Sequence, residues 1–174
     1  MVQNKSDREK AAAIVRDAGG QIVGRTRFQK IAFLLELAGL GEGFQFEYKH
    51  YGPYSEELAA AISSAAILGL VQVEDREASW GGWYSIYTST DKSADIVNQQ
   101  RQTLAHEATK IGAVELELAA TAAYLNAFEG LQDAWTETAR RKPEKASQER
   151  LARAKEAYRR LLLIETPEKL PAII

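Results

Sequence analysis

The chain has 174 residues, of which 45% are hydrophobic and 26% are charged, and its formal net charge is −2. This composition is typical of a globular domain with a sizeable core, and the net charge does not indicate that the chain as a whole binds a polyanion. The sequence contains no cysteine, which excludes disulfides, thiolate metal ligands and cysteine nucleophiles.

The N-terminal segment MVQNKSDREK is polar and lacks the apolar stretch of a signal peptide. The longest apolar runs are too short to span a bilayer. We therefore expect a cytoplasmic protein with no membrane partner. Its charge is uneven, because residues 56–91 carry six acidic side chains against one arginine, whereas residues 1–55 and 143–174 are each slightly basic.

The first elements are two predicted helices. SDREKAAAIVRDAGG predicts a helix that Ser6 or Asp7 caps and that Gly19–Gly20 ends, and QIVG after it is a very short extended piece. TRFQKIAFLLELAGLG predicts a second helix with Thr26 as its N-cap. Three cations crowd the start of this helix against the usual preference of its dipole, namely Arg25, Arg27 and Lys30.

An extended segment, a turn, a helix and a hairpin follow. FQFEYKHY alternates like a half-buried strand, GPY is predicted to turn the chain, and Ser55 is predicted to cap a third helix. Glu56 and Glu57 occupy the first turn of that helix, which contains no lysine or arginine. LVQVEDREASWGGWYSIYTST then predicts a β-hairpin connected at Gly81–Gly82.

After Thr90 the composition becomes that of helices. We predict a long helical region from about Ser93 to Ala127, with Gly112 and Gly130 as weak points. RRKPEKAS is predicted to be a solvated hinge, and a last helix capped by Ser147 is predicted to stop before Pro167.

This order of elements predicts an α+β, mostly α fold. Residues 1–91 would form a winged helix-turn-helix-like domain, since a hairpin follows three helices and a short strand. Residues 92–174 would form a helical extension whose apolar faces either pack on that domain or mediate dimerisation.

Two motifs carry a family resemblance. GRTRFQK at the start of the second helix and YGPYSEEL before the third resemble the YwgA-like family of uncharacterised bacterial and archaeal proteins. More distantly they are similar to the Panacea domain of SocA-type antitoxins. The resemblance covers about residues 20–75 and implies a winged-helix-like core with a link to regulation or toxin neutralisation. It implies no catalytic residues.

The tyrosine-rich motif raises the question of enzyme activity. The sequence has no nucleophile elbow, P-loop, zinc-binding helix or dinucleotide-binding glycine pattern, and its two histidines, His50 and His106, form no metal-binding spacing. We therefore expect no enzyme, no metal and no cofactor, and we expect the motif to be structural. Its members are Tyr51, Gly52, Pro53, Tyr54 and Ser55. A small-ligand sensor or an enzyme that uses the tyrosines and His50 is the weakest alternative.

Binding of a macromolecule is the better-supported class. For DNA, the candidate phosphate contacts are Arg25, Arg27, Lys30 and Lys49. The helix before the hairpin usually reads the major groove, but here that helix and the hairpin are both acidic. A dimeric DNA-binding regulator therefore ranks second.

Binding of another protein ranks first. The candidate contacts are the acidic helix start and the aromatic hairpin, namely Glu56, Glu57, Trp80, Trp83 and Tyr84. Of the two tryptophans, Trp83 is expected to fold back onto the core. The predicted function is thus a non-enzymatic regulatory or antitoxin-like protein that binds a protein partner, such as a toxin or defence component, with a homodimer as a further possibility.

Overall fold

Seven helices and five short strands make up the part of the chain that the structure, a computed structural model, describes, residues 4–91 and 98–173. In chain order they are α1 (Asp7–Asp17), β1 (Gln21–Val23), α2 (Arg25–Leu37), β2 (Glu47–Lys49), β3 (Gly52–Tyr54), α3 (Glu56–Ile67), β4 (Val71–Glu77), β5 (Trp83–Ser89), α4 (Gln99–Thr109), α5 (Ala113–Glu129), α6 (Ala134–Arg141) and α7 (Gln148–Leu162). The predicted α+β, mostly helical class is confirmed. The predicted boundary after residue 91 falls at residues 92–97, which lie outside the described residues.

The helix starts follow local capping chemistry. Ser6 and Glu9 form a reciprocal capping box at the start of α1, and the Ser55 hydroxyl accepts a hydrogen bond from the Leu58 N–H at the start of α3. The prediction that Thr26 caps the second helix is wrong. Gly24 is the N-cap, with a φ of 98° and no side-chain cap, so α2 already begins at Arg25.

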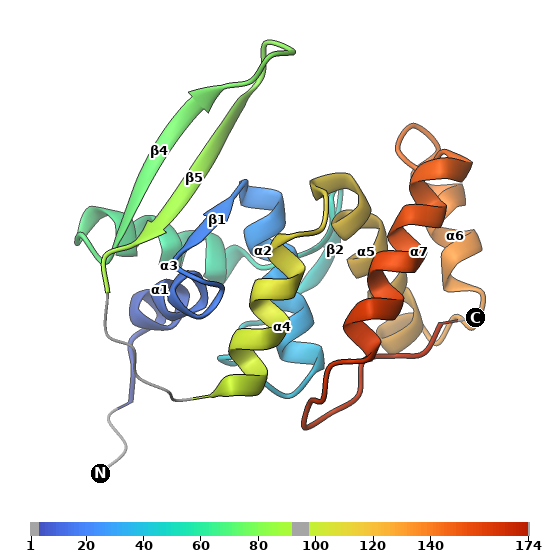
Figure 1. Ribbon diagram of the computed structural model, residues 1–174, viewed down its shortest axis with the longest axis horizontal. Coiled ribbons are helices and arrows are strands. Elements are labelled where there is room, and N and C mark those ends of the chain that lie inside the picture. The colour runs from blue at the N-terminus through green and yellow to red at the C-terminus, as the bar shows by residue number, and fades with distance from the viewer. Residues whose placement is uncertain (1–3, 92–97, 174) are drawn as a thin grey trace.

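The strands form two sheets. β1, β5 and β4 form an antiparallel sheet in that order, and β2 pairs with β3 in a separate two-stranded sheet. The predicted hairpin is confirmed, with Val71 opposite Ser89 and Glu77 opposite Trp83. Figure 1 shows this hairpin projecting from the helical body at the end remote from α6 and α7.

The extended segment before α3 differs from its prediction. The strand predicted over residues 44–51 is reduced to β2, because the Glu36 carboxylate accepts hydrogen bonds from the N–H groups of Glu42, Gly43 and Phe44 and holds them in a loop. The prediction that GPY makes the turn is also wrong. The turn lies at His50–Tyr51, and GPY is the returning strand β3.

The C-terminal half also differs. The helical region predicted from about Ser93 to Ala127 is two helices, α4 and α5, separated at the predicted weak point Gly112. The residues before Asn98 in that prediction lie outside the described residues. Gly130 ends α5 in the left-handed conformation, with a φ of 69°. α6 was not predicted. Arg140 and Arg141, which the sequence places in a hinge, belong to it.

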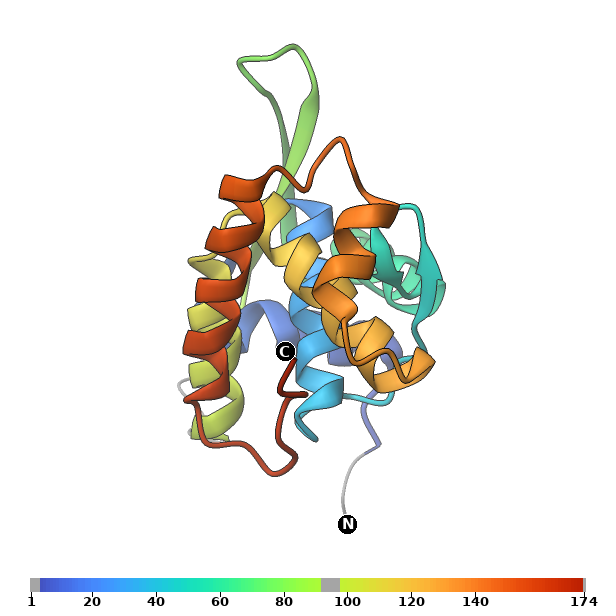
Figure 2. The same cartoon turned by 90° about the vertical axis from the view of Figure 1, so that its right-hand side faces the viewer.

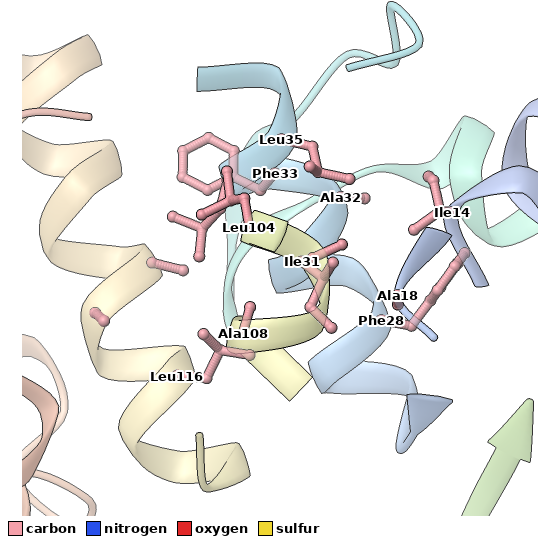
Figure 3. Packing of buried hydrophobic residues seen from close by; sticks show 14 of the residues in the cluster. Ile14, Ala18, Phe28, Ile31, Ala32, Phe33, Leu35, Leu104, Ala108 and Leu116 are labelled. Carbon is pink, nitrogen blue, oxygen red and sulfur yellow. The ribbon is translucent and has the colours of Figure 1, made fainter. Parts of the chain in front are cut away.

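One hydrophobic core joins the two halves of the chain. The side chains of α2 lie at its centre, between those of α1 on one side and of α4 and α5 on the other (Figure 3). α7 packs along α5, and Figure 2 shows α6 and α7 covering the same end of the body. The apolar faces of α4, α5 and α7 are therefore buried within the chain. Among the described residues, every helix is too short or too polar to cross a membrane.

Candidate functional site

The β4–β5 hairpin ends in a tight aromatic tip. The Ala78 N–H donates to the Gly82 carbonyl at 2.6 Å, and the Gly81 N–H donates to the Ala78 carbonyl at 2.9 Å. Gly81 has a φ of 89°, which suits the third position of a three-residue hairpin loop. Trp80, in this loop, is 80% exposed.

Trp83 does not fold back onto the core, and that prediction is wrong. It is 70% exposed, because the register places it opposite Glu77 at the far end of the hairpin, beyond the helices that could cover it. Tyr84, its neighbour, is half-buried. The tip thus presents two large aromatic side chains to solvent, as protein-binding loops do.

The hairpin is acidic along β4. Arg76 is neutralised within the strand, since its guanidinium donates to both carboxylate oxygens of Glu74 at 2.9 and 3.1 Å. Asp75 accepts a hydrogen bond from the Ser85 hydroxyl, and Glu77 has no polar side-chain partner among the described residues. Once the Arg76–Glu74 pair is set aside, the charged side chains of β4 are the two carboxylates of Asp75 and Glu77.

The two sets of predicted protein contacts do not lie together. Glu56 and Glu57 are exposed at the start of α3, beside the β2–β3 sheet, and Glu56 pairs with Lys49 at 2.5 Å. The opposite end of α3 leads into β4 (Figure 1). The tryptophans lie at the far end of the hairpin, since Trp83 is opposite Glu77 and Trp80 is in the connecting loop. The structure therefore separates the acidic helix start from the aromatic tip.

A shallow groove of mixed polarity that the sequence did not reveal lies at the base of the hairpin. It has a volume of about 500 Å³ and is lined by apolar and polar residues, namely Ala66, Gly69, Val71, Gln72, Val73, Glu74, Ile86 and Thr88. Ile67 is 85% exposed beside it, and Leu68 and Val73 are also exposed. The signal was present in AAILGLV, which carries more large apolar residues than the buried stripe of α3 can accommodate.

Each of the four candidate phosphate contacts has a partner within the chain, and two of the four, Arg25 and Lys49, make theirs at the surface. Arg25 donates to the Ser85 hydroxyl at 3.1 Å, and Lys49 pairs with Glu56, which raises the pKa of Lys49. Arg27 donates to the carbonyls of Val23 and Ile111, and burial lowers its pKa. Lys30 is fully buried, so a phosphate group outside the protein does not reach it in this structure.

Lys30 belongs to a set of side chains that hold β3 and the turn before it in place. We term this set the β3 clamp; it consists of Gln29, Lys30, Glu117, Lys142 and Lys145. The Gln29 amide donates to the Ser55 carbonyl at 3.0 Å and accepts from the Ser55 N–H at 2.9 Å. The Lys30 ammonium donates to the Pro53 carbonyl at 2.7 Å. The Gln-Lys pair of the first motif therefore binds the peptide groups of the second motif.

The rest of the clamp comes from the C-terminal half. Lys142 donates to the His50 carbonyl at 2.8 Å and to Glu117 at 2.9 Å, and both side chains are buried. Lys145 also pairs with Glu117 and lies 4.4 Å from the ring centroid of Tyr51. The prediction of a solvated hinge is thus wrong for Lys142. The signal for this contact was Glu117, an acid directly followed by the largely apolar run LAATAAYL of α5.

Gly52 lets the turn approach α5 closely. It has a φ of 83°, and a Cβ at this position would collide with the Thr121 hydroxyl. His50, by contrast, is exposed and stacks edge-on against the exposed ring of Tyr51. Tyr54 is half-buried under the Lys49 ammonium. The motif thus forms a tightly held joint whose histidine and Tyr51 ring face solvent.

Comparison with known proteins supports the first of the two resemblances. The chain is 28% identical over 120 residues to the uncharacterized protein YwgA of Bacillus subtilis (strain 168), an alignment that spans 66% of this chain and 70% of YwgA. No family model matches the chain. The similarity supports a YwgA-like family, and it carries no function because YwgA is itself uncharacterised. The likeness to Panacea domains stays a prediction.

Proposed function

We propose that this chain is a non-enzymatic, winged-helix-like regulatory protein that acts by binding another protein through the β4–β5 hairpin. The element order α1–β1–α2–α3–β4–β5, with β1 completing the sheet beside β5, supports the winged-helix description. The small β2–β3 sheet is an insertion before α3 in that arrangement.

The observation that carries the proposal is the exposure of large apolar side chains on the projecting hairpin and at the end of α3 from which it starts. Trp80 and Trp83 at the tip, and Ile67 and Leu68 at the base, are all exposed. Tryptophan is the side chain most enriched among residues that dominate binding energy at protein interfaces. An apolar surface rimmed by charge is typical of a protein interaction site.

DNA binding ranks second in this proposal. Phosphate contacts need cations that are free to leave their internal partners, and Arg27 and Lys30 are committed to backbone carbonyls. α3 carries Glu56 and Glu57 and no cation, and it is poorly suited to the groove of a polyanion. Arg25 is the exposed candidate that remains best placed.

The partner class follows from the same surface. Acidic side chains along β4 favour a partner that is basic where it meets the hairpin. The likeness of the Gln-Lys and Tyr-Gly-Pro motifs to antitoxin domains makes a toxin encoded beside this chain the first partner to test.

The test is retrieval of a partner from the source organism with the full chain as bait. A defined protein should be retained by the wild type and lost on Trp80→Ala combined with Trp83→Ala. The matched control is Leu163→Ala, since Leu163 is equally exposed but lies at the end of α7, away from the hairpin. Equal retention by the tryptophan variant would show that the hairpin is not the interface.

A parallel titration addresses DNA. Fluorescence anisotropy of a labelled duplex at low salt should show no saturable binding by the wild type. Saturable binding that falls steeply with salt and weakens on Arg25→Ala would support the DNA-binding alternative instead.

A further inference from the structure

The backbone of β4 has one open side. Two hydrogen bonds frame its pairing with β5, from Ala78 N–H to the Gly82 carbonyl and from Thr90 N–H to the Leu70 carbonyl. In an antiparallel ladder the hydrogen-bonded pairs alternate, so the even-numbered residues of β4 bond to β5. The peptide groups of Val73, Asp75 and Glu77 therefore point away from β5.

The contacts on the other side of β5 agree with this register. Gly24 N–H donates to the Ser85 carbonyl, and Ser89 N–H donates to the Gly20 carbonyl, so the odd residues of β5 face β1. The even residues of β5 are then left for β4, as the pairing requires. Since β4 is the edge of its sheet in the described chain, its outward peptide groups have no strand beside them.

We propose that β4 is the docking edge for an extended, basic segment of the partner protein, which adds to the sheet as a fourth strand antiparallel to β4. This inference rests on the proposed function and specifies how the partner binds. Strand addition would supply main-chain hydrogen bonds to the odd residues, and side chains of the added strand would supply the specificity.

The chemistry of the added strand follows from the side chains that it would face. Its residues opposite Glu77 and Asp75 would share one face of the sheet with Trp83 and Ser85. Cations at both positions would pair with the two carboxylates, and one of them would lie against the indole ring of Trp83. The residue opposite Val73 would be apolar, since the Val73 side chain is exposed beside it.

Charge selects this occupant over a second copy of the chain. β4 carries three carboxylates, Glu74, Asp75 and Glu77, against the single guanidinium of Arg76. Two β4 strands paired edge to edge would bring six carboxylates against two guanidinium groups. Like charges opposite one another destabilise a strand pair, whereas a basic strand relieves the repulsion.

The probe is a short synthetic peptide in which lysine alternates with threonine and is followed by alternating valine and threonine. Its control has glutamate in place of each lysine. The peptide is titrated into the full-length protein, and binding is followed by amide NMR shifts. The N–H signals of Val73, Asp75 and Glu77 should shift, and the affinity for the peptide should fall with added salt.

The deciding variant is Glu77→Pro, and Glu77→Gln is its matched control for the loss of charge. Proline removes an outward N–H that the β4–β5 ladder does not use, so the hairpin is retained. Affinity for the peptide should fall about tenfold with proline, which removes one main-chain bond and the charge, and less with glutamine, which removes only the charge. An unchanged amide spectrum of the remaining strand residues verifies folding of each variant.

Three results would overturn strand addition: unchanged peptide affinity in Glu77→Pro, shifts confined to the tryptophan tip, or a dimer in gel filtration that Glu77→Pro converts to a monomer. If the native partner is still lost on Trp80→Ala with Trp83→Ala in any of these cases, protein binding by the hairpin stands without it. Equal retention by those tryptophan variants would contradict the proposed function itself.

Discussion

At the scale of single residues, Lys30 shows how far a pattern of charge can mislead. In the sequence it is one of three cations at a helix start, and in the structure it is buried with its ammonium on the Pro53 carbonyl. The helical periodicity of α2 places Lys30 next to the buried Ile31 and Phe28, but periodicity cannot say which long side chain turns inward. The partner that decides this, β3, lies more than twenty residues further along the chain.

Burial of Lys30 predicts a pH dependence of stability. Desolvation lowers its pKa from 10.5 to about 7, with Glu117 opposing the shift and Lys142 and Lys145 adding to it. Between these pH values the unfolded chain binds a proton that the folded chain does not, so the free energy of unfolding rises with pH across this window. The cost of burying the charged form is full below pH 7.

The measurement is urea denaturation of the wild type and Lys30→Met between pH 6 and pH 9.5. The wild type should gain about 3 kcal/mol relative to the variant as the pH rises, because methionine has no proton to release. Lys169→Met, at an exposed lysine, serves as the control and should follow the wild type. Parallel pH profiles for the wild type and Lys30→Met would contradict a buried lysine with a lowered pKa.

At the scale of elements, the β4–β5 hairpin was predictable because period-two alternation and the glycines between its arms are local signals. The exposure of Trp83 was not predictable, because it depends on how far the hairpin extends beyond the body. α6 was missed for a similar reason. Its sequence is short and charged, and it is held by contacts with α5 that only the folded chain supplies.

The exposed tip predicts that its tryptophans serve binding rather than folding. Trp80→Ala and Trp83→Ala should each change the midpoint of thermal unfolding by no more than about 2 °C, since exposed substitutions alter stability by less than about 0.5 kcal/mol. Phe28→Ala, which empties a buried site packed against Tyr87, should cost about 3–5 kcal/mol. A large loss of stability in the tryptophan variants would mean that the tip is a structural element.

At the scale of the whole molecule, buried ion pairs join the N-terminal and C-terminal halves. Arg101 of α4 binds Asp17 of α1 at 2.6 Å, donates to the Leu40 carbonyl at 2.8 Å and lies 3.1 Å from Glu42. Together with the β3 clamp, this contact fixes the helical extension against the first half of the chain. Such long-range pairs leave no trace in local sequence patterns, so the docking of the extension could not be predicted.

Removal of one partner of this buried pair should be costly. Arg101→Met leaves the buried Asp17 with Arg16 as its remaining cation and leaves the Leu40 carbonyl without its donor, and it should lower the free energy of unfolding by about 3 kcal/mol. Arg153→Met, at an exposed arginine in two surface pairs, should cost less than about 1 kcal/mol. Urea denaturation measures both, and equal small losses would show that the Arg101 contact contributes little to joining the halves.

The central claim, that the β4–β5 hairpin is the interface for a protein partner, is tested most directly by hydrogen–deuterium exchange on the complex recovered with the wild-type chain. We expect slower exchange at the outward amides of β4, with added protection of Trp80 and Trp83, and unchanged exchange in α7. Protection confined to α7 or to the start of α3, with the hairpin amides exchanging as in the free protein, would contradict it.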